Sequence, residues 1–153
     1  MKKIALGIFL IALVAVTTNA TLGDKDWLHG KTYEVQQTEF KEGAPKPSVK
    51  PIKDEFTFNK GKLYSDFVGG DKIKFDKYLK YELKKDSTYT EEDEERHYYE
   101  IEVTSENDDG QKLEIKITVD DINIEGSIKL SKGDKLKKHY EFTGKEKPKK
   151  GKK

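Results

Sequence analysis

The stretch of residues 112–142 constrains the fold most, because apolar and polar side chains alternate through nearly all of it. Strict alternation puts one row of side chains in a core and the other in water, which is typical of a half-buried β-strand. Polar turns at residues 120–121 and 131–134 divide the stretch into three strands of an antiparallel meander. The expected apolar row is Leu113, Ile115, Ile117, Val119, Ile122, Ile124, Ile128, Leu130, Leu136, Tyr140 and Phe142.

Five earlier segments carry the same signal, and we predict strands over residues 31–40, 54–58, 62–68, 74–84 and 97–106. Residues 41–53 contain Pro45, Pro47 and Pro51, which a central strand does not accommodate, so a loop is expected there. Residues 86–95 are acidic and poor in apolar side chains, which predicts a second, solvated loop.

Together with the three strands of residues 112–142, these five segments give eight strands with short connections. No segment shows a helical period. The sequence therefore predicts an all-β domain. We favour an eight-stranded antiparallel up-and-down barrel, because closure removes the exposed sheet edges. A two-sheet sandwich gives the same alternation and is the alternative architecture.

The first twenty residues are typical of a cleaved signal peptide. Lys2 and Lys3 precede an apolar run over residues 4–16, and Thr18 and Ala20 supply the small residues expected before a cleavage site. A membrane-spanning helix needs roughly 20 apolar residues, more than this run provides. We therefore expect cleavage after Ala20, a secreted or periplasmic protein without stable membrane insertion, and a mature domain over residues 21–144.

Charge is unevenly distributed along the chain. Residues 145–153 hold six lysines and one glutamate, so this tail is expected to be disordered. Without the tail and the leader, 22 basic and 28 acidic residues remain, a net charge of −6 that argues against a nucleic-acid-binding surface. The tail either keeps the protein soluble or attracts it weakly to an anionic surface. The chain has no cysteine, so its fold cannot depend on disulfides.

Four segments, residues 30–35, 54–65, 122–128 and 140–145, resemble those of lipocalin-like (calycin-type) barrels. The chain is most similar to the small exported lipocalin-like proteins of Bacteroidetes. That resemblance implies a β-barrel with an interior able to bind a small molecule. Lipocalins usually open with Gly, one residue and then Trp, whereas here two residues separate Gly30 from Tyr33, and Trp27 lies upstream. No flanking helix is predicted either, so the resemblance implies the barrel more strongly than a lipid cargo.

No catalytic site is predicted. The three histidines are His29 in a turn, His139 on an outward position and His97 at a strand end, and none has a recognisable nucleophile partner. The acidic residues 91–95 lack the alternating ligands and central glycine of an EF-hand, so we predict no metal site. The expectation is a protein that is not an enzyme and uses no cofactor.

The barrel interior supplies the only binding-site candidates. Two lysines, Lys77 and Lys138, share the inward parity of the aromatic residues and could meet the anionic head of an amphipathic ligand. The alternative is a packed core with both lysines reaching the rim, because eight strands leave little interior space. The candidates are Tyr33, Phe56, Phe58, Phe75, Lys77, Tyr81, Tyr99, Lys138 and Tyr140.

Two functions follow from these expectations. The first is binding of a small hydrophobic or amphipathic ligand inside the barrel. The second is a packed barrel that acts through its surface loops, residues 41–53 and 86–95, as a protein-binding or inhibitor module of the cell envelope. In either case we expect a monomer.

Overall fold

The computed structural model describes residues 27–41, 46–47 and 50–148. Every regular element in this part of the chain is a β-strand. No helix among the described residues is long and apolar enough to cross a membrane. The predicted signal peptide lies outside the described residues, as does much of the proline-containing segment. The strands are β1 Thr32–Phe40, β2 Ile52–Asn59, β3 Lys62–Tyr64, β4 Tyr78–Lys80, β5 Glu82–Glu91, β6 Glu94–Glu106, β7 Gln111–Asp120, β8 Asn123–Lys132 and β9 Lys135–Glu146.

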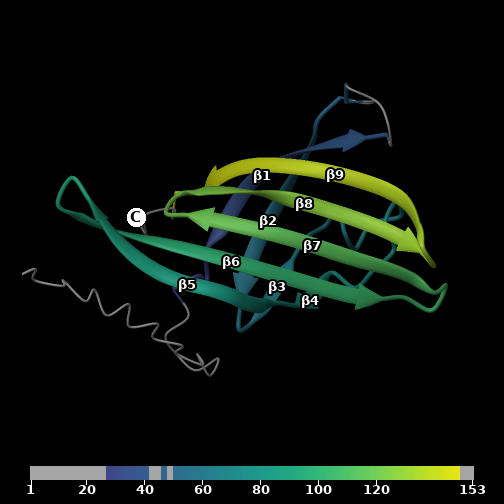
Figure 1. Cartoon of the computed structure of the whole chain (residues 1–153), viewed down its shortest axis with the longest axis horizontal. Helices are drawn as coiled ribbons and strands as arrows, with labels where there is room; N and C mark the ends of the chain where they lie inside the picture. Colours follow the sequence, from purple (N-terminus) through teal and green to yellow (C-terminus); the bar gives the residue numbers. More distant parts are fainter. Residues whose placement is uncertain (1–26, 42–45, 48–49, 149–153) are drawn as a thin grey trace, which may run out of the picture.

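The strands form one antiparallel sheet with the order β4-β3-β2-β1-β9-β8-β7-β6-β5. Only Tyr81 separates β4, at one edge of the sheet, from β5 at the other. The sheet therefore curves back on itself into a nearly closed, barrel-like shape, in which β4 also contacts β6. In Figure 1 the long strands β6 to β9 cross in front of β1 and β2, and the turn between β5 and β6 extends beyond its neighbours.

The core lies inside this curve, on the face that the alternation predicted. The apolar residues of β7 and all but one of the expected residues of β8 and β9 are buried. Of that row, Leu136 is half-buried and Ile122 is 47% exposed, because it sits in the turn between β7 and β8 rather than in a strand. All-β architecture and inward burial are thus confirmed.

Two non-strand segments lie against the ends of the curved sheet. At one end, the turn at Trp27 and Leu28 packs on the core, and Leu28 is fully buried. The other segment is the loop of residues 65–77, which buries Val68, Ile73 and Phe75. We call it the plug loop.

Two glycines allow the strands to approach closely where the sheet curves. A Cβ added to Gly144 would lie 2.2 Å from the carbonyl oxygen of Glu34, and one added to Gly126 would lie 2.0 Å from that of Lys116. No side chain fits at these distances, so the curvature depends on glycine at both positions.

The structure has nine strands where the sequence predicted eight. The predicted strand over residues 74–84 starts only at Tyr78 and is divided at Tyr81, where the chain changes its hydrogen-bonding partner from β3 to β6. The strand predicted to end at residue 68 stops at Tyr64, because the following residues fold inward as the plug loop.

The prediction of a solvated loop over residues 86–95 is wrong. Residues 86–91 belong to β5 and residues 94–95 to β6, and a two-residue turn at Glu92 and Asp93 joins them. The hairpin carries few apolar residues because both of its faces are largely exposed near the turn, so burial leaves no alternating pattern there. It is held instead by side-chain contacts: Arg96 bonds Asp121 at 2.6 Å, and the Tyr89 hydroxyl donates to Asp120 at 2.5 Å.

The domain also extends further than expected at its C-terminus. Lys145 and Glu146 complete β9, and the Lys147 amide donates to the carbonyl of Thr32 at 2.7 Å. The lysine-rich tail therefore begins at residue 148 or later. Residues 149–153 lie outside the described residues.

The turn between β5 and β6 yields a test of the hairpin. Glu92 and Asp93 both have positive φ, 52° and 66°, the left-handed region that costs a non-glycine residue about 1–2 kcal/mol. Asp93→Gly should stabilise the hairpin by roughly 0.5–1 kcal/mol, because glycine suits this type of two-residue turn. Hydrogen exchange of the β5 and β6 amides measures the effect. Asp109→Gly, at a turn residue without a positive φ, should give no such gain. Equal protection in both variants would contradict the assigned turn.

Candidate functional site

The aromatic candidates from the sequence lie together in the core. They pack edge to face: the Phe58 ring lies 5.9 Å from Tyr33 and 5.5 Å from Tyr81, and Phe56 lies 4.9 Å from Phe142. Side chains rather than solvent thus occupy the space between these strands. The seven candidates, each at most 8% exposed, are Tyr33, Phe56, Phe58, Phe75, Tyr81, Tyr99 and Tyr140.

The two lysine candidates do not join the aromatic residues. Lys77 precedes β4, so strand parity does not orient it. Its side chain is 54% exposed and its ammonium pairs with Asp66 at 3.3 Å. Lys138 is half-buried, and its ammonium donates to the carbonyl of Lys72 in the plug loop at 3.2 Å. Neither lysine supplies an interior cation in this structure.

A buried polar network, which the sequence analysis missed, fastens the plug loop to the sheet. One carboxylate oxygen of Asp54 accepts from the Ser65 hydroxyl at 2.6 Å and from the Gln37 amide at 3.0 Å. The Ser65 hydroxyl in turn accepts from the Val68 amide at 3.1 Å. Gln37 and Ser65 are at most 1% exposed, and the Gln37 carbonyl oxygen has no partner among the described residues.

Burial raises the pKa of Asp54, and the hydrogen bonds from Ser65 and the backbone oppose that shift only in part. A carboxylate is expensive to bury, so the hydrogen bonds from Ser65, Gln37 and the Phe67 amide are needed to keep it inside. The signal for this network is in the sequence: Gln37 shares the inward parity of Val35, and Asp54 shares that of Phe56. A polar residue at an inward position predicts a buried partner, but not which one.

The opposite end of the barrel is covered by an aromatic stack. The Trp27 ring lies 4.5 Å from His97 and 5.6 Å from Tyr99, and the Lys31 ammonium sits 3.1 Å from the Trp27 ring centre. Lys31 also pairs with Glu146 at 2.8 Å. Burial raises the pKa of Tyr33, whose hydroxyl donates to the Asp121 carbonyl. The end is therefore closed by contacts between the first turn, β6 and β9.

The three histidines have separate roles. His29 Nδ1 accepts from the Lys60 amide at 3.2 Å, His97 belongs to the Trp27 stack, and His139 lies 6.0 Å from the Phe40 ring. In the described part of the chain, no group of three or more acidic or histidine side chains is placed to hold a metal ion.

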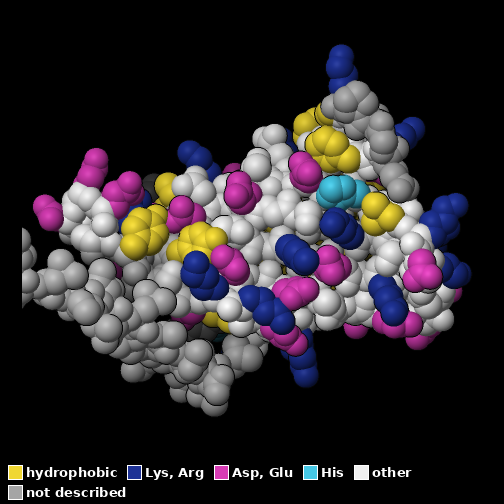
Figure 2. All heavy atoms as spheres, in the orientation of Figure 1, with side chains coloured by type: hydrophobic (Ala, Val, Ile, Leu, Met, Phe, Trp, Pro, Cys, Tyr) yellow, Lys and Arg dark blue, Asp and Glu magenta, His cyan; other side chains and the backbone are white. Residues whose placement is uncertain are grey.

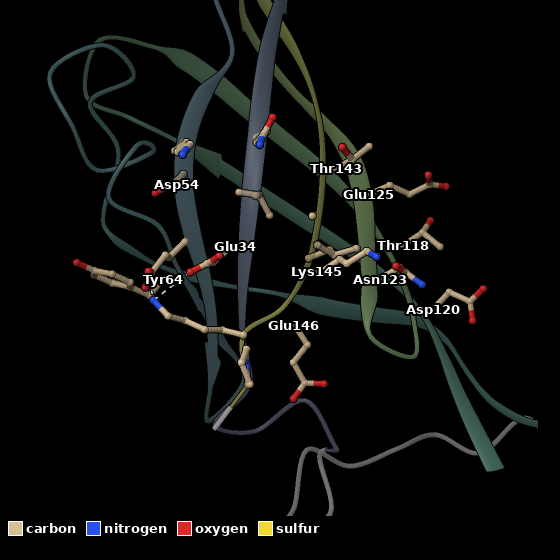
Figure 3. Close-up of a pocket in the computed structure, with 18 of the residues that line it drawn as sticks. Glu34, Asp54, Tyr64, Thr118, Asp120, Asn123, Glu125, Thr143, Lys145 and Glu146 are labelled. Carbon is tan, nitrogen blue, oxygen red and sulfur yellow. Dashed lines mark hydrogen bonds and ion pairs between the residues drawn. The ribbon is translucent and has the colours of Figure 1, made fainter. Parts of the chain in front are cut away.

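A large hollow on the described surface lies outside the barrel. It crosses the outward side of β1, β2 and β7 to β9, and its volume is about 1260 Å³. We call it the outer groove. In Figure 3 Glu34 and Tyr64 lie on one side, Thr118 and Glu125 on the other, and Lys145 between them. Such a hollow exceeds the roughly 300–1,000 Å³ of an ordinary small-molecule pocket.

The outer groove is more acidic than basic. Lys147 links β1 and β2 at the groove by pairing with Glu34 at 3.3 Å and with Glu55. A hydrogen bond from Tyr64 lowers the pKa of Asp66 and raises that of Tyr64 to about 12. Figure 2 shows acidic and basic side chains interspersed over the visible face of the molecule. The charged lining residues are Glu34, Asp54, Glu55, Asp66, Asp120, Glu125 and Glu146 against Lys53, Lys145 and Lys147.

No known protein family, curated protein or solved structure matches this chain.

Removal of the Asp54 carboxylate tests the polar network. Asp54→Ala should lower the free energy of unfolding by about 1–3 kcal/mol, because it leaves Ser65 and Gln37 buried without their acceptor. Since the folded protein binds the Asp54 proton more tightly than the unfolded chain, ionisation costs stability. The stability lost in Asp54→Ala should therefore be largest below the usual carboxyl pKa. It should shrink as pH rises through the raised pKa of Asp54 in the folded protein.

Urea denaturation of both proteins across the acidic pH range measures the loss. Lys53→Ala, at the neighbouring exposed position, is the matched control and should change stability little. A pH-independent difference between Asp54→Ala and the parent would refute the role assigned to Asp54.

Proposed function

We propose that this chain is an exported binding protein that acts through its outer surface, and that the outer groove recognises a protein segment rich in basic residues. One observation carries the proposal. The aromatic residues that would line an internal site contact one another, whereas a hollow of about 1260 Å³ lies open on the outside. No catalytic role is proposed.

The charge of the outer groove favours this class of partner. The Asp54 carboxylate is turned inward to Ser65 and Gln37, which leaves six acidic residues against three lysines along the groove, so a cationic segment would meet a favourable potential. Tyr64 and Tyr98 add flat apolar surface of the kind that interface residues bury. The groove runs across several strands, which suits an extended chain better than a compact ligand.

The finer fold belongs to the same proposal. β4 and β5 correspond to one strand bent at Tyr81, which makes the sheet an eight-stranded up-and-down barrel of the lipocalin-like type that the sequence resembles. Export follows in this proposal from cleavage of residues 1–20 as a signal peptide, whose lysines, apolar run and small residues support it. The lysine-rich tail then offers weak attraction to anionic surfaces, while the groove supplies specificity.

The test uses a fluorescent peptide of alternating lysine and serine as the probe. The chain should bind it with an affinity that falls as salt rises. Glu34→Gln, Asp120→Asn and Glu125→Gln together should weaken binding about tenfold, because three attractive charges are lost from one face. The measurement is fluorescence anisotropy at two ionic strengths.

A matched triple variant controls for net charge. Glu106→Gln, Asp108→Asn and Asp134→Asn remove the same charge from exposed positions outside the groove. This control should bind within about twofold of the parent. If both triple variants lose affinity equally, the groove is not the recognition surface.

A second candidate function keeps a ligand inside the barrel. The observation that favours it is the side-chain carbonyl oxygen of Gln37. This atom is buried beside Asp54, behind the plug loop, and has no partner among the described residues. If the loop opened, these groups would meet the polar head of a small amphipathic molecule while the aromatic residues held its apolar part.

Native mass spectrometry of protein purified from its own host tests this second function. A bound small molecule should add a discrete mass that disappears on denaturation. Phe67→Ala, which removes the contact of the plug loop with Tyr140 at 5.1 Å, should increase exchange of that mass for an added fatty acid. An unliganded mass alone, with no uptake by either protein, would contradict it.

A further inference from the structure

β5 is an edge strand with a long unpaired side. In the part of the chain that the structure describes, β5 bonds only to β6, while β4 on the other side of Tyr81 bonds to β3. A register shift interrupts the pairing between Leu83 and Lys85, after which the ladder continues regularly to Glu91. Edges of this kind attract a further strand unless something blocks them.

The backbone groups that face outward can be assigned. The His97 carbonyl accepts from the Asp121 amide at 2.7 Å, so the backbone groups of His97 point toward β7. Thr88 pairs with His97 across β5 and β6. In an antiparallel ladder the direction alternates along each strand, so the Thr88 amide and carbonyl point away from β6. By the same alternation, those of Asp86 and Thr90 do too.

The side chains along this edge are arranged to complement a second copy of the same strand. Lys85 lies near the start of the regular ladder and Glu91 at its end, with side-chain exposures of 55% and 61%. Their contacts within the chain are long, 3.9 Å from Lys85 to Glu100 and 3.6 Å from Glu91 to Arg96. Lys85 also lies 4.9 Å over the Tyr98 ring, but both side chains are more than half exposed, so their charges can reach a partner as well.

We propose that two copies of this chain pair through their β5 strands, antiparallel, about a two-fold axis at Thr88. This register places Thr88 opposite itself, Asp86 opposite Thr90 and Lys85 opposite Glu91, and symmetry makes each unlike pair twice. A shift that centres the axis on Ser87 would put Asp86 opposite Thr88. Lys85 and Glu91 would then each lie opposite a residue of no opposite charge. The charges thus select the first register.

A single strand pair buries a small interface, so the dimer is weak and concentration-dependent. It goes beyond the proposed function, because no residue of β5 lines the outer groove. It also departs from the monomer that the sequence predicts. The competing occupant is residues 21–26 of the same chain, which precede Trp27 and would cover the edge without dimerisation.

A single-cysteine experiment tests the axis, because the chain has no cysteine of its own. In the chain beginning at Thr21, Thr88→Cys should form a disulfide-linked dimer on mild oxidation. Directly opposed residues have Cα atoms about 5.5 Å apart, within the range that a disulfide spans. Thr90→Cys is the matched control and should not cross-link, since four residues of offset separate it from its copy by roughly 13 Å.

A charge swap tests the register without cysteine. Lys85→Glu and Glu91→Lys each place like charges opposite one another, and each should raise the dimer dissociation constant about tenfold. The double variant K85E/E91K restores two attractive pairs and should return it to near the parent value. Sedimentation equilibrium over a range of concentrations measures all four proteins, and circular dichroism checks that each is folded.

Each result of these experiments either supports the dimer or contradicts it. Cross-linking at residue 88 but not 90, with rescue by the double swap, supports the proposal. A parent chain that stays monomeric at all concentrations, equal cross-linking at both positions, or a double variant no better than the single ones would overturn it. A monomer with slow hydrogen exchange at Thr88 would assign the edge to residues 21–26 instead and would also overturn it.

Discussion

The curvature of this sheet depends on the chain's change of partner at Tyr81. β4 and β5 stand at opposite ends of a nine-stranded order, yet one residue connects them. In a flat sheet, eight inter-strand spacings would separate the two edges by roughly 38 Å. Two peptide units span only about 7 Å. The sheet must therefore bend until its edges meet, and Tyr81, 2% exposed and bonded through its amide to the Gly61 carbonyl, fixes that point.

Closure determines what the inside and outside of the molecule can do. A sheet curved this tightly encloses little volume, and aromatic side chains from β1, β2 and β9 pack there edge to face. The plug loop and the Trp27 stack then cover the two ends. Holding the plug loop with Asp54 costs folding free energy, because burial disfavours the charged form of this carboxyl and raises its pKa. Open, polar surface is found on the outer face, where the groove lies.

The sequence predicts those elements whose side chains are sorted by burial, and it fails where they are not. β7 to β9 follow directly from alternation because one face is in the core along their whole length. Residues 86–91 give no such signal, since both faces of β5 are exposed and cross-strand contacts hold the hairpin. The inward position predicted for Lys77 is wrong, because the strand whose alternation would orient it begins only at Tyr78. The outer groove is beyond sequence reasoning, because its lining comes from strands far apart in the chain.

The hairpin of β5 and β6 is energetically distinct from the rest of the barrel. Its outer part buries almost no apolar surface, and its ladder is supported by Arg96 between Asp121, Glu91 and Glu94. The pairs with Glu91 and Glu94 involve exposed carboxylates and contribute little individually, so the tip should open far more readily than the core strands. β3 and β4, at the other edge of the sheet, have three residues each, whereas β5 has ten. The mismatch in length is what leaves the strand projecting, and its charges and the register shift beside Leu83 limit the partners that it can accept.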